Sequence, residues 1–227
     1  MNEKLVQMVV GKLQKYRPVK LALPLSESVC VSIAEKGYER CNARLQNLGF
    51  AEIRLGQTGL RPPEILRIFS SGKKLIATSR TDKSLLAYAI VCHAPMMDIE
   101  LDAPDRDHFI EMAKKQDCKV IVSHHDHEKT PSREELLEIK KQCLGAGADI
   151  VKIVCTARTD ADCDNLLSLA DPSTVAFGMG GLATFTRIAS LIHGSPYTYA
   201  SLASGKETAP GQLTNQQICE IVERLSL

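Results

Sequence analysis

The chain has 227 residues, of which 44% are hydrophobic and 24% charged, the proportions of an average soluble globular protein. A net charge of +1 argues against a nucleic-acid partner, and the apolar runs fall far short of the ~20 residues of a membrane-spanning helix. The eight cysteines are scattered without a C-x-x-C pair, and the N-terminal residues lack the apolar core of a signal peptide. We therefore expect a cytoplasmic protein with reduced thiols, and no nucleic-acid or membrane partner.

Apolar segments of strand length alternate along the chain with amphipathic segments of helical length. The expected strands are residues 20–26, 50–56, 74–80, 96–102, 119–125, 149–156, 173–180 and 197–202. The expected helices are residues 32–48, 62–71, 82–92, 106–116, 132–147, 160–170, 182–192 and 215–225. Asp82, Ser132 and Asp160 are expected to cap three of these helices.

This alternation predicts an α/β fold with a parallel sheet covered on both faces. Eight repeats at a mean spacing of about 25 residues favour a (β/α)8 TIM barrel over an open sheet. No G-x-G-x-x-G follows an expected strand, which argues against a dinucleotide site. No linker or low-complexity stretch interrupts the pattern, so residues 1–227 are expected to form a single domain.

Lys152 lies inside the apolar strand DIVKIVCT and is the most informative polar residue. In a barrel, the chemistry collects at the carboxyl ends of the strands. Desolvation favours the neutral form of an amine, and the neutral amine is the form that attacks a carbonyl. Two other interpretations stay open from position alone, namely a lysine that reaches solvent from the strand end and one that pairs with a carboxylate.

The segment SHHDHEKTPS holds three histidines, at positions 124, 125 and 127. His125 and His127 alternate and could point to the same side of an extended strand, as in the H-x-H pairs of metal-dependent hydrolases. The remaining histidines lie in or beside expected helices, and two histidines alone make a poor zinc site. We expect no metal here, one working histidine, and loop positions for His124 and His127.

Seven segments together resemble the type I 3-dehydroquinate dehydratases. They are EIRL (52–55), IATSRT (76–81), DIEL (98–101), VSHHDHEKTPS (122–132), GADIVKI (147–153), FGMGGLATFTRI (177–188) and GSPYTYASLASGKETAPGQL (194–213). Each segment is moderately specific, whereas their common order along most of the chain is strongly so.

The resemblance implies a dehydratase of the shikimate pathway that acts on 3-dehydroquinate without a metal or organic cofactor, as a homodimer. His125 matches the family's general acid and base, and Lys152 its Schiff-base lysine. The residues that match substrate-binding positions are Glu52, Arg54, Arg80, Arg187, Thr208 and Gln212. Thr208 stands where the family usually has serine, which keeps the hydroxyl.

Three positions depart from the family pattern. Gly56 replaces an aspartate, Ser84 stands where a glutamate near the histidine is expected, and His127 replaces an aromatic residue. Three other functions are compatible with parts of this pattern: a lysine-dependent aldolase, a metal-dependent hydrolase, and a barrel that binds ligand without turnover. Retention of both His125 and Lys152 argues against the last.

Overall fold

The computed structural model describes residues 3–15, 21 and 23–226. It divides into two compact units, which are described separately. Unit 1 comprises residues 1–30, 125–139 and 153–227, and unit 2 comprises residues 31–124 and 140–152.

The eight strands of the described residues form one sheet in the order β7-β6-β5-β4-β3-β2-β1-β8. They are β1 Val29–Ile33, β2 Phe50–Arg54, β3 Lys74–Thr78, β4 Met96–Glu100, β5 Lys119–Asp126, β6 Ile150–Thr156, β7 Thr174–Met179 and β8 Thr198–Ser201. The strands from β1 to β7 follow one another in chain order and β8 neighbours β1, so the sheet of the described strands is a nearly closed barrel, with β7 and β8 at the two ends of the order. The predicted (β/α)8 barrel fold is confirmed.

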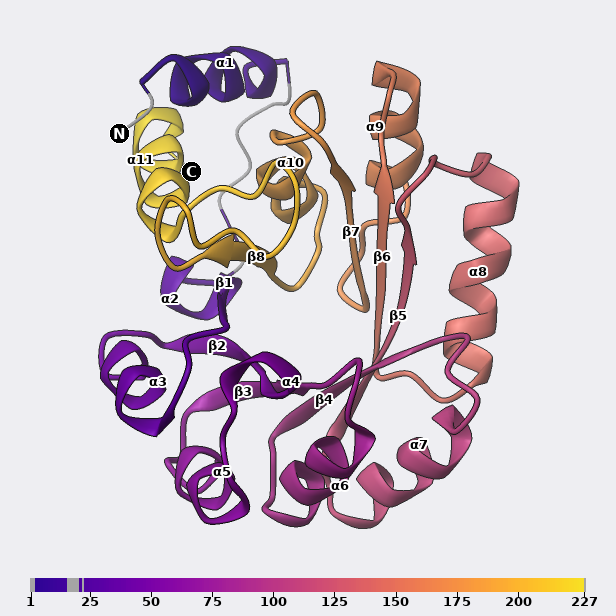
Figure 1. The fold of residues 1–227 in the computed structure, drawn as a ribbon. Coiled ribbons are helices and arrows are strands. Elements are labelled where there is room, and N and C mark those ends of the chain that lie inside the picture. Colours follow the sequence, from indigo (N-terminus) through magenta and orange to yellow (C-terminus); the bar gives the residue numbers. More distant parts are fainter. Residues whose placement is uncertain (1–2, 16–20, 22, 227) are drawn as a thin grey trace. The chain divides into compact units, whose positions relative to one another are not determined.

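Two of the described helices precede the first strand, one follows the last strand, and the others fall between strands (Figure 1). They are α1 Glu3–Leu13, α2 Leu25–Ser28, α3 Tyr38–Leu45, α4 Leu55–Thr58, α5 Pro62–Phe69, α6 Lys83–Val91, α7 Arg106–Lys115, α8 Arg133–Gly145, α9 Asp160–Leu167, α10 Thr186–Ile192 and α11 Asn215–Leu225. Among the residues that the structure describes, no helix is long and apolar enough to cross a membrane.

The prediction of the first strand is wrong. Residues 25–28 form α2 directly after Pro24, and the strand lies at Val29–Ile33, where the sequence predicted the start of a helix. Lys20 and Ala22 of the predicted strand lie outside the described residues. Both VCVSI and KLALPLS are apolar, but VCVSI has the β-branched residues that favour strands, whereas KLALPLS contains proline. The following helix therefore begins only at Tyr38.

In unit 2, strands β1 to β5 pair in parallel, and their register brings polar residues onto neighbouring positions. Ser32 lies opposite Glu52, Thr78 opposite Asp98, and Glu100 opposite Ser123. Helix α6 packs on β3 and α7 on β4, and both helices lie on the same side of these strands (Figure 1). The strand register therefore gathers the polar side chains of unit 2 from segments far apart in the sequence.

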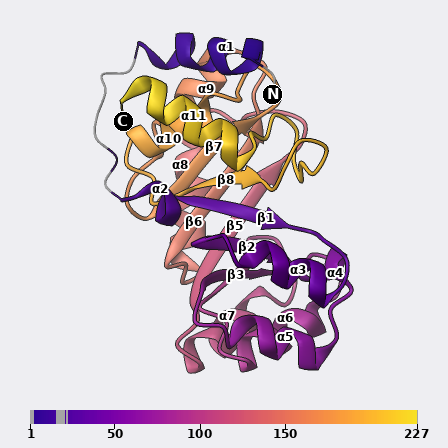
Figure 2. The same cartoon turned by 90° about the vertical axis from the view of Figure 1, so that its left-hand side faces the viewer.

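In unit 1, the N-terminal helix α1 packs along the C-terminal helix α11 (Figure 2). Val6, Val9 and Leu13 of α1 are buried, and their spacing of three and four residues places them on one helix face. Burial of three such side chains contributes about 1.5–3 kcal/mol each. Helix α1 is thus a packed part of unit 1.

Helix caps explain where several of these helices begin. Asp82 accepts a hydrogen bond from the backbone N–H of Ser84 at 2.9 Å, and Ser132 exchanges hydrogen bonds with Glu135, as predicted. The cap predicted at Asp160 is wrong, because Thr159 is the cap, and its hydroxyl accepts from the backbone of Asp162. The hydroxyl of Thr159, one residue earlier, thus pairs with a backbone N–H in the first turn of α9 that has no partner within the helix.

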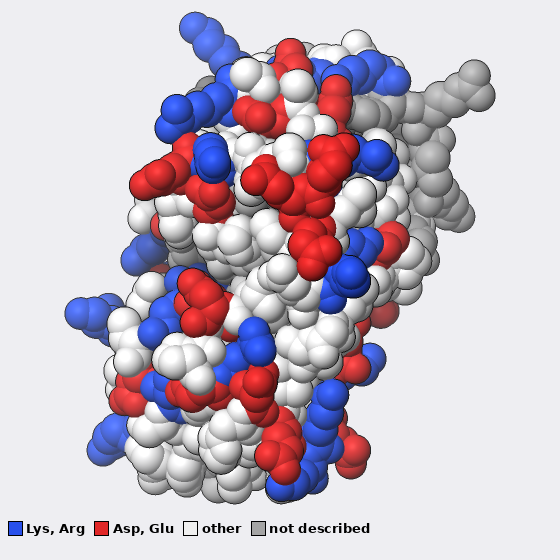
Figure 3. Space-filling model, turned by 90° about the vertical axis from the view of Figure 1, so that its right-hand side faces the viewer, with Lys and Arg blue, Asp and Glu red and all other residues white. Residues whose placement is uncertain are grey.

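Charges of both signs are interspersed on the surface that Figure 3 shows, in keeping with a net charge of +1.

Candidate active site

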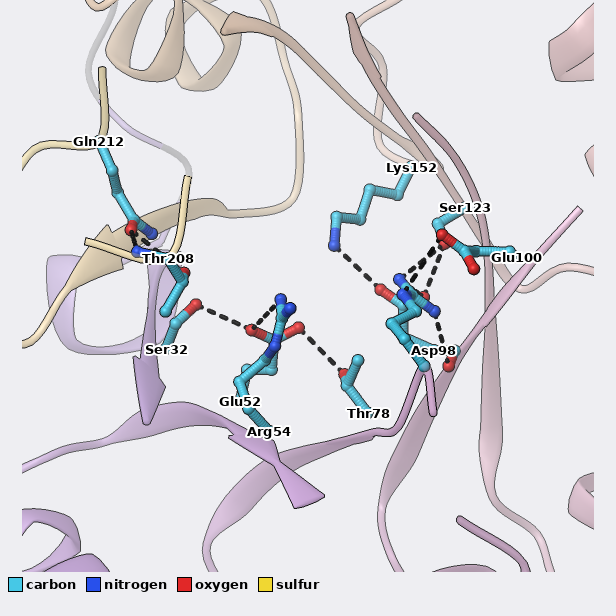
Figure 4. Close-up of polar contacts among 11 residues, drawn as sticks. Ser32, Glu52, Arg54, Thr78, Asp98, Glu100, Ser123, Lys152, Thr208 and Gln212 are labelled. Atoms are coloured by element: carbon cyan, nitrogen blue, oxygen red, sulfur yellow. Dashed lines mark hydrogen bonds and ion pairs between the residues drawn. The ribbon is translucent and has the colours of Figure 1, made fainter. Parts of the chain in front are cut away.

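Lys152 belongs to a buried polar cluster in unit 2 (Figure 4). Its side chain projects from β6, is only 5% exposed, and donates to Oδ2 of Asp98 at 2.9 Å. Asp98 is fully buried on β4. Of the interpretations left open for this lysine, the observed contact is a pairing with a carboxylate, and burial of that pair makes it a stronger interaction than a surface ion pair.

Arg80 shares the same carboxylate. Its Nη2 lies 2.7 Å from Oδ1 of Asp98 and donates to the hydroxyl of Ser123 at 3.1 Å, and its Nε lies 3.4 Å from Glu100. Burial by itself lowers the pKa of the Arg80 guanidinium, but Asp98 and Glu100 outweigh burial and raise that pKa above its ordinary value. Asp98 therefore holds two cationic side chains, one on each oxygen.

Glu52 forms a second polar group within unit 2. Its carboxylate is 1% exposed and accepts hydrogen bonds from the hydroxyls of Ser32 at 2.8 Å and Thr78 at 3.0 Å (Figure 4). Arg54, two residues later on the same strand, places Nη1 3.7 Å from Glu52. Residues two apart on a strand point to the same side, so Glu52 and Arg54 can act on one ligand.

The histidines His125 and His127 lie in unit 1 at the end of β5. Their rings are stacked, with centroids 6.3 Å apart and an angle of 10° between the planes. The following loop is fastened by Asp126, which accepts from the backbone of Glu128, and by Thr156, whose hydroxyl donates to the carbonyl of His127 at 2.9 Å. His125 is half-buried, whereas His127 is exposed.

Within the described ranges, no three His, Cys, Asp or Glu side chains converge as metal ligands. The stacked pair of histidines thus has no third ligand of these types among the residues that the structure places.

Arg187, at the start of α10 in unit 1, is a buried cation. Its side chain is 1% exposed, its guanidinium lies 4.4 Å from the ring centroid of Phe177, and its Nε donates to the carbonyl of Gly211 at 3.3 Å. Its Nη2 has no hydrogen-bond partner among the described residues. Burial lowers the pKa of Arg187 to about 9. A cation held in this way is suited to bind an anionic group from outside the chain.

Thr208 and Gln212 contact each other in the segment after β8 (Figure 4). The backbone N–H and the hydroxyl of Thr208 both donate to Oε1 of Gln212, at 2.7 and 3.2 Å. Gln212 is 7% exposed, so the pair is held at the edge of the interior of unit 1.

The predicted site residues fall into two sets. Unit 2 brings together Glu52 with Arg54, and Arg80 with Lys152 through Asp98; unit 1 holds His125, Arg187, Thr208 and Gln212. The sequence places Asp98 and Glu100 at a strand end, where the chemistry of a barrel collects, but assigns them no role, and it does not identify Ser32, Thr78 and Ser123 as parts of the site. The i, i+2 spacing of Asp98 and Glu100 was a usable signal, whereas serine and threonine hydroxyls carry none.

The two unusual positions near Arg80 also have a structural setting. Ser84 donates from both its backbone N–H and its hydroxyl to Asp82, so it serves the cap of α6. At Gly56, an added Cβ would lie 2.6 Å from the hydroxyl oxygen of Thr81. Any side chain at position 56 therefore requires Thr81 to move.

Comparison of the sequence with family models identifies the type I 3-dehydroquinase model, which matches residues 66–226. A 3-dehydroquinate dehydratase from Methanosarcina mazei is 32% identical over 228 residues, which cover 87% of this chain and 94% of the relative. A 3-dehydroquinate dehydratase from Dehalococcoides mccartyi is 39% identical over 141 residues, 60% of this chain. The chain covers 63% of the length of that second relative, less than two thirds.

Solved structures share the fold. The type I 3-dehydroquinate dehydratase of Clostridium difficile, solved with covalently modified comenic acid, has a TM-score of 0.75 at 21% identity, over 88% of this chain and 92% of that one. The 3-dehydroquinate dehydratase of Geobacillus kaustophilus has a TM-score of 0.74 at 18% identity, over 88% and 91%.

Proposed function

We propose that this chain, which belongs to the type I 3-dehydroquinase family, converts 3-dehydroquinate to 3-dehydroshikimate and water. The observation that carries the proposal is the buried Lys152 on β6, with its Nζ held 2.9 Å from a carboxylate oxygen of Asp98. A buried lysine with a partner that can take up its proton is equipped for nucleophilic attack on a ketone.

The first step forms a Schiff base. The neutral amine of Lys152 adds to the ring ketone, and the resulting carbinolamine loses water to give an iminium. Asp98 is placed to accept the proton that the ammonium gives up, because Oδ2 already accepts its hydrogen bond. The iminium then withdraws electrons from the adjacent C–H bond, which makes that proton removable.

His125 performs the proton transfers of the second step. It removes the proton next to the iminium carbon as general base, and the enamine that forms expels the β-hydroxyl group. The protonated imidazole returns its proton to the leaving oxygen, so that the group leaves as water. Hydrolysis of the product iminium consumes one water and frees Lys152. An imidazole suits both roles because its ordinary pKa lies near neutrality.

The remaining predicted residues bind the substrate. Arg187 pairs with the substrate carboxylate, which supplies the hydrogen-bond partner that its buried Nη2 lacks among the described residues. Glu52, Arg54, Arg80, Thr208 and Gln212 bind the ring hydroxyls and complete the orientation of the ring. The set contains arginines for a carboxylate and oxygen acceptors for hydroxyls, which fits a polyhydroxylated ring acid.

Borohydride reduction in the presence of 3-dehydroquinate tests the mechanism. We expect a reduced adduct on the peptide that contains Lys152, detected by mass spectrometry, and its loss in Lys152→Met. A spectrophotometric assay for the conjugated enone product tests turnover itself. Turnover without an adduct would exclude the Schiff-base mechanism, and an adduct-free, inactive wild-type protein would exclude the proposed function.

Membership in the family also carries expectations for the oligomeric state, the cellular compartment and the pathway of the protein. We propose that the protein is a cytoplasmic homodimer that serves the shikimate pathway. Light scattering coupled to gel filtration measures its mass in solution, and a monomeric mass at assay concentrations would overturn the dimer.

A further inference from the structure

We propose that Lys12 of the N-terminal helix α1 is a positioning residue, which holds the segment 180–185 and through it the guanidinium of Arg187. The inference rests on the proposed function in one respect, because it assigns Arg187 the carboxylate of the substrate. All residues concerned belong to unit 1.

Helix α1 is held at its beginning and along its length. At its beginning, Glu3 forms a bidentate ion pair with Arg224 of α11, with N–O distances of 2.9 and 3.1 Å. Along its length, Val6, Val9 and Leu13 are buried. These contacts hold the backbone of α1 in place, and they thereby fix the position from which the long side chain of Lys12 extends.

Lys12 makes three contacts with segments that follow β6 and β7. Its Nζ lies 3.3 Å from Asp160 Oδ1 and donates to the carbonyl of Leu182 at 3.4 Å. It also lies 4.9 Å from the ring centroid of Phe185, which is itself 1% exposed. The cation therefore contacts the segment at Leu182 and again at Phe185, by a hydrogen bond and a cation–π contact.

From this segment, one path leads to Arg187 along the chain. Phe185 immediately precedes α10, and Arg187 is the second residue of that helix. The turn at residues 183–186 is held by Thr186. Its hydroxyl donates to the carbonyl of Ala183 at 2.6 Å and accepts from the backbone N–H of Gly178 at 2.9 Å. A shift of Phe185 is thus transmitted to the start of α10.

A second path reaches Arg187 through the backbone of the segment after β8. The N–H of Gly180 donates to the carbonyl of Pro210 at 3.4 Å, and the carbonyl of Gly211 accepts from Nε of Arg187. Gly211 has a φ of +71°, and a Cβ there would lie 2.5 Å from the carbonyl oxygen of Gly180. The two backbones therefore touch, and the position of one constrains the other.

Residues 180–185, which Lys12 contacts, are therefore connected to the guanidinium of Arg187 in two ways: along the chain into α10, and through the backbone of Pro210 and Gly211. Loss of the Lys12 contacts should loosen residues 180–187 and 208–212 and weaken binding of an anionic ligand, without altering chemistry at Lys152. A partly exposed ion pair of this kind is worth a modest factor, about two- to fivefold in an equilibrium constant.

The test uses Lys12→Met in the full-length protein, which keeps the aliphatic stem and removes the charge. Hydrogen–deuterium exchange should be about two- to fivefold faster in peptides covering residues 179–187 and 205–213, with no change in β2 and β3. The KM for 3-dehydroquinate should rise by a similar factor at unchanged kcat. Lys12→Arg should restore both values, and Lys4→Met, at an exposed position on the same helix, should alter neither.

Unchanged exchange in both peptides of Lys12→Met would overturn the proposal, and so would faster exchange throughout the chain, which would indicate loss of stability. A fall in kcat with unchanged KM would also contradict it. If the wild-type protein does not turn over 3-dehydroquinate, the proposed function fails, while the exchange measurement still decides whether Lys12 holds residues 180–187.

Discussion

The Nζ atom of Lys152 lies 2.9 Å from Oδ2 of Asp98, a carboxylate that is fully buried. The second oxygen of Asp98 lies 2.7 Å from Nη2 of Arg80, so one carboxylate is shared by two cationic side chains. In a buried cluster such as this, removal of the shared charge costs more than loss of either contact alone, because Lys152 and Arg80 lose their common carboxylate together.

Asp98→Asn should therefore lower both stability and the rate of Schiff-base formation. Asparagine keeps the shape and an acceptor oxygen but leaves the cations of Arg80 and Lys152 buried together. We expect a loss of about 3–5 kcal/mol in the free energy of unfolding, measured by urea denaturation. Borohydride trapping of substrate should be about ten- to a hundredfold slower in protein that remains folded.

The matched control is Asp102→Asn, which alters an exposed acid just after the same strand. It should leave both measurements unchanged. Trapping at the wild-type rate in folded Asp98→Asn would show that Asp98 does not assist Lys152.

Strands β2 to β8 could be located from the sequence because each is a short apolar run bounded by polar or glycine-containing segments. Strand β1 could not, because two apolar runs of similar length adjoin each other there, and only the structure shows that VCVSI enters the sheet. That error also concealed Ser32, whose hydroxyl binds Glu52.

Lys152 and Asp98 were both recognisable as polar residues of expected strands, whereas their pairing was not. Asp98 lies 54 residues earlier, and its pairing with Lys152 depends on the strand register, which no local pattern encodes. The same holds for Thr78 and Ser123, whose hydroxyls become informative only when the register places them beside Glu52 and Arg80. The roles of the predicted site residues stay predictions.

Replacement of His125 should distinguish it from its stacked neighbour His127. His125→Ala should reduce kcat by about 10²–10⁴-fold, the usual contribution of a general acid or base. His127→Ala should reduce it less than about threefold, because its ring is exposed and its backbone carbonyl, which binds Thr156, is retained. Steady-state assays of both variants measure the difference. Equal losses would indicate that the two imidazoles act together, as metal ligands would.

Alkaline pH should destabilise the protein through its buried thiols. Burial raises the pKa of Cys118 and Cys155 to about 12, and that of Cys41, Cys143 and Cys163 to about 11. Below about pH 9 both folded and unfolded thiols keep their protons, so stability is fully present. Between about pH 9 and the folded pKa the unfolded chain loses protons first, and stability falls by about 1.4 kcal/mol per pH unit for each thiol.

Urea denaturation at pH 8, 9 and 10 measures this slope. In Cys118→Ala, the fall of the free energy of unfolding with pH should be smaller by the contribution of one thiol. Cys219→Ala, at a half-buried position, should change this fall less. A slope that is the same in wild type and Cys118→Ala would rule out ionisation of this thiol as a cause.

Gly56→Asp, which introduces the residue usual in the family, should be destabilising in this chain. The new Cβ would lie 2.6 Å from the hydroxyl oxygen of Thr81, which is closer than van der Waals contact permits. The Thr81 side chain must rotate, and we expect a loss of about 1–2 kcal/mol in the free energy of unfolding. In Thr81→Ala the clashing oxygen is absent, and the Cβ of residue 81 lies at an ordinary distance of 3.9 Å.

A double-mutant cycle of Gly56→Asp and Thr81→Ala tests this coupling by urea denaturation. The cost of Gly56→Asp should fall by about 0.5–1 kcal/mol in the Thr81→Ala background, since residues in direct contact are not additive. Additive effects would show that Gly56 is retained for another reason. If the double variant also binds 3-dehydroquinate more tightly, the aspartate contributes to binding and its absence here was made necessary by Thr81.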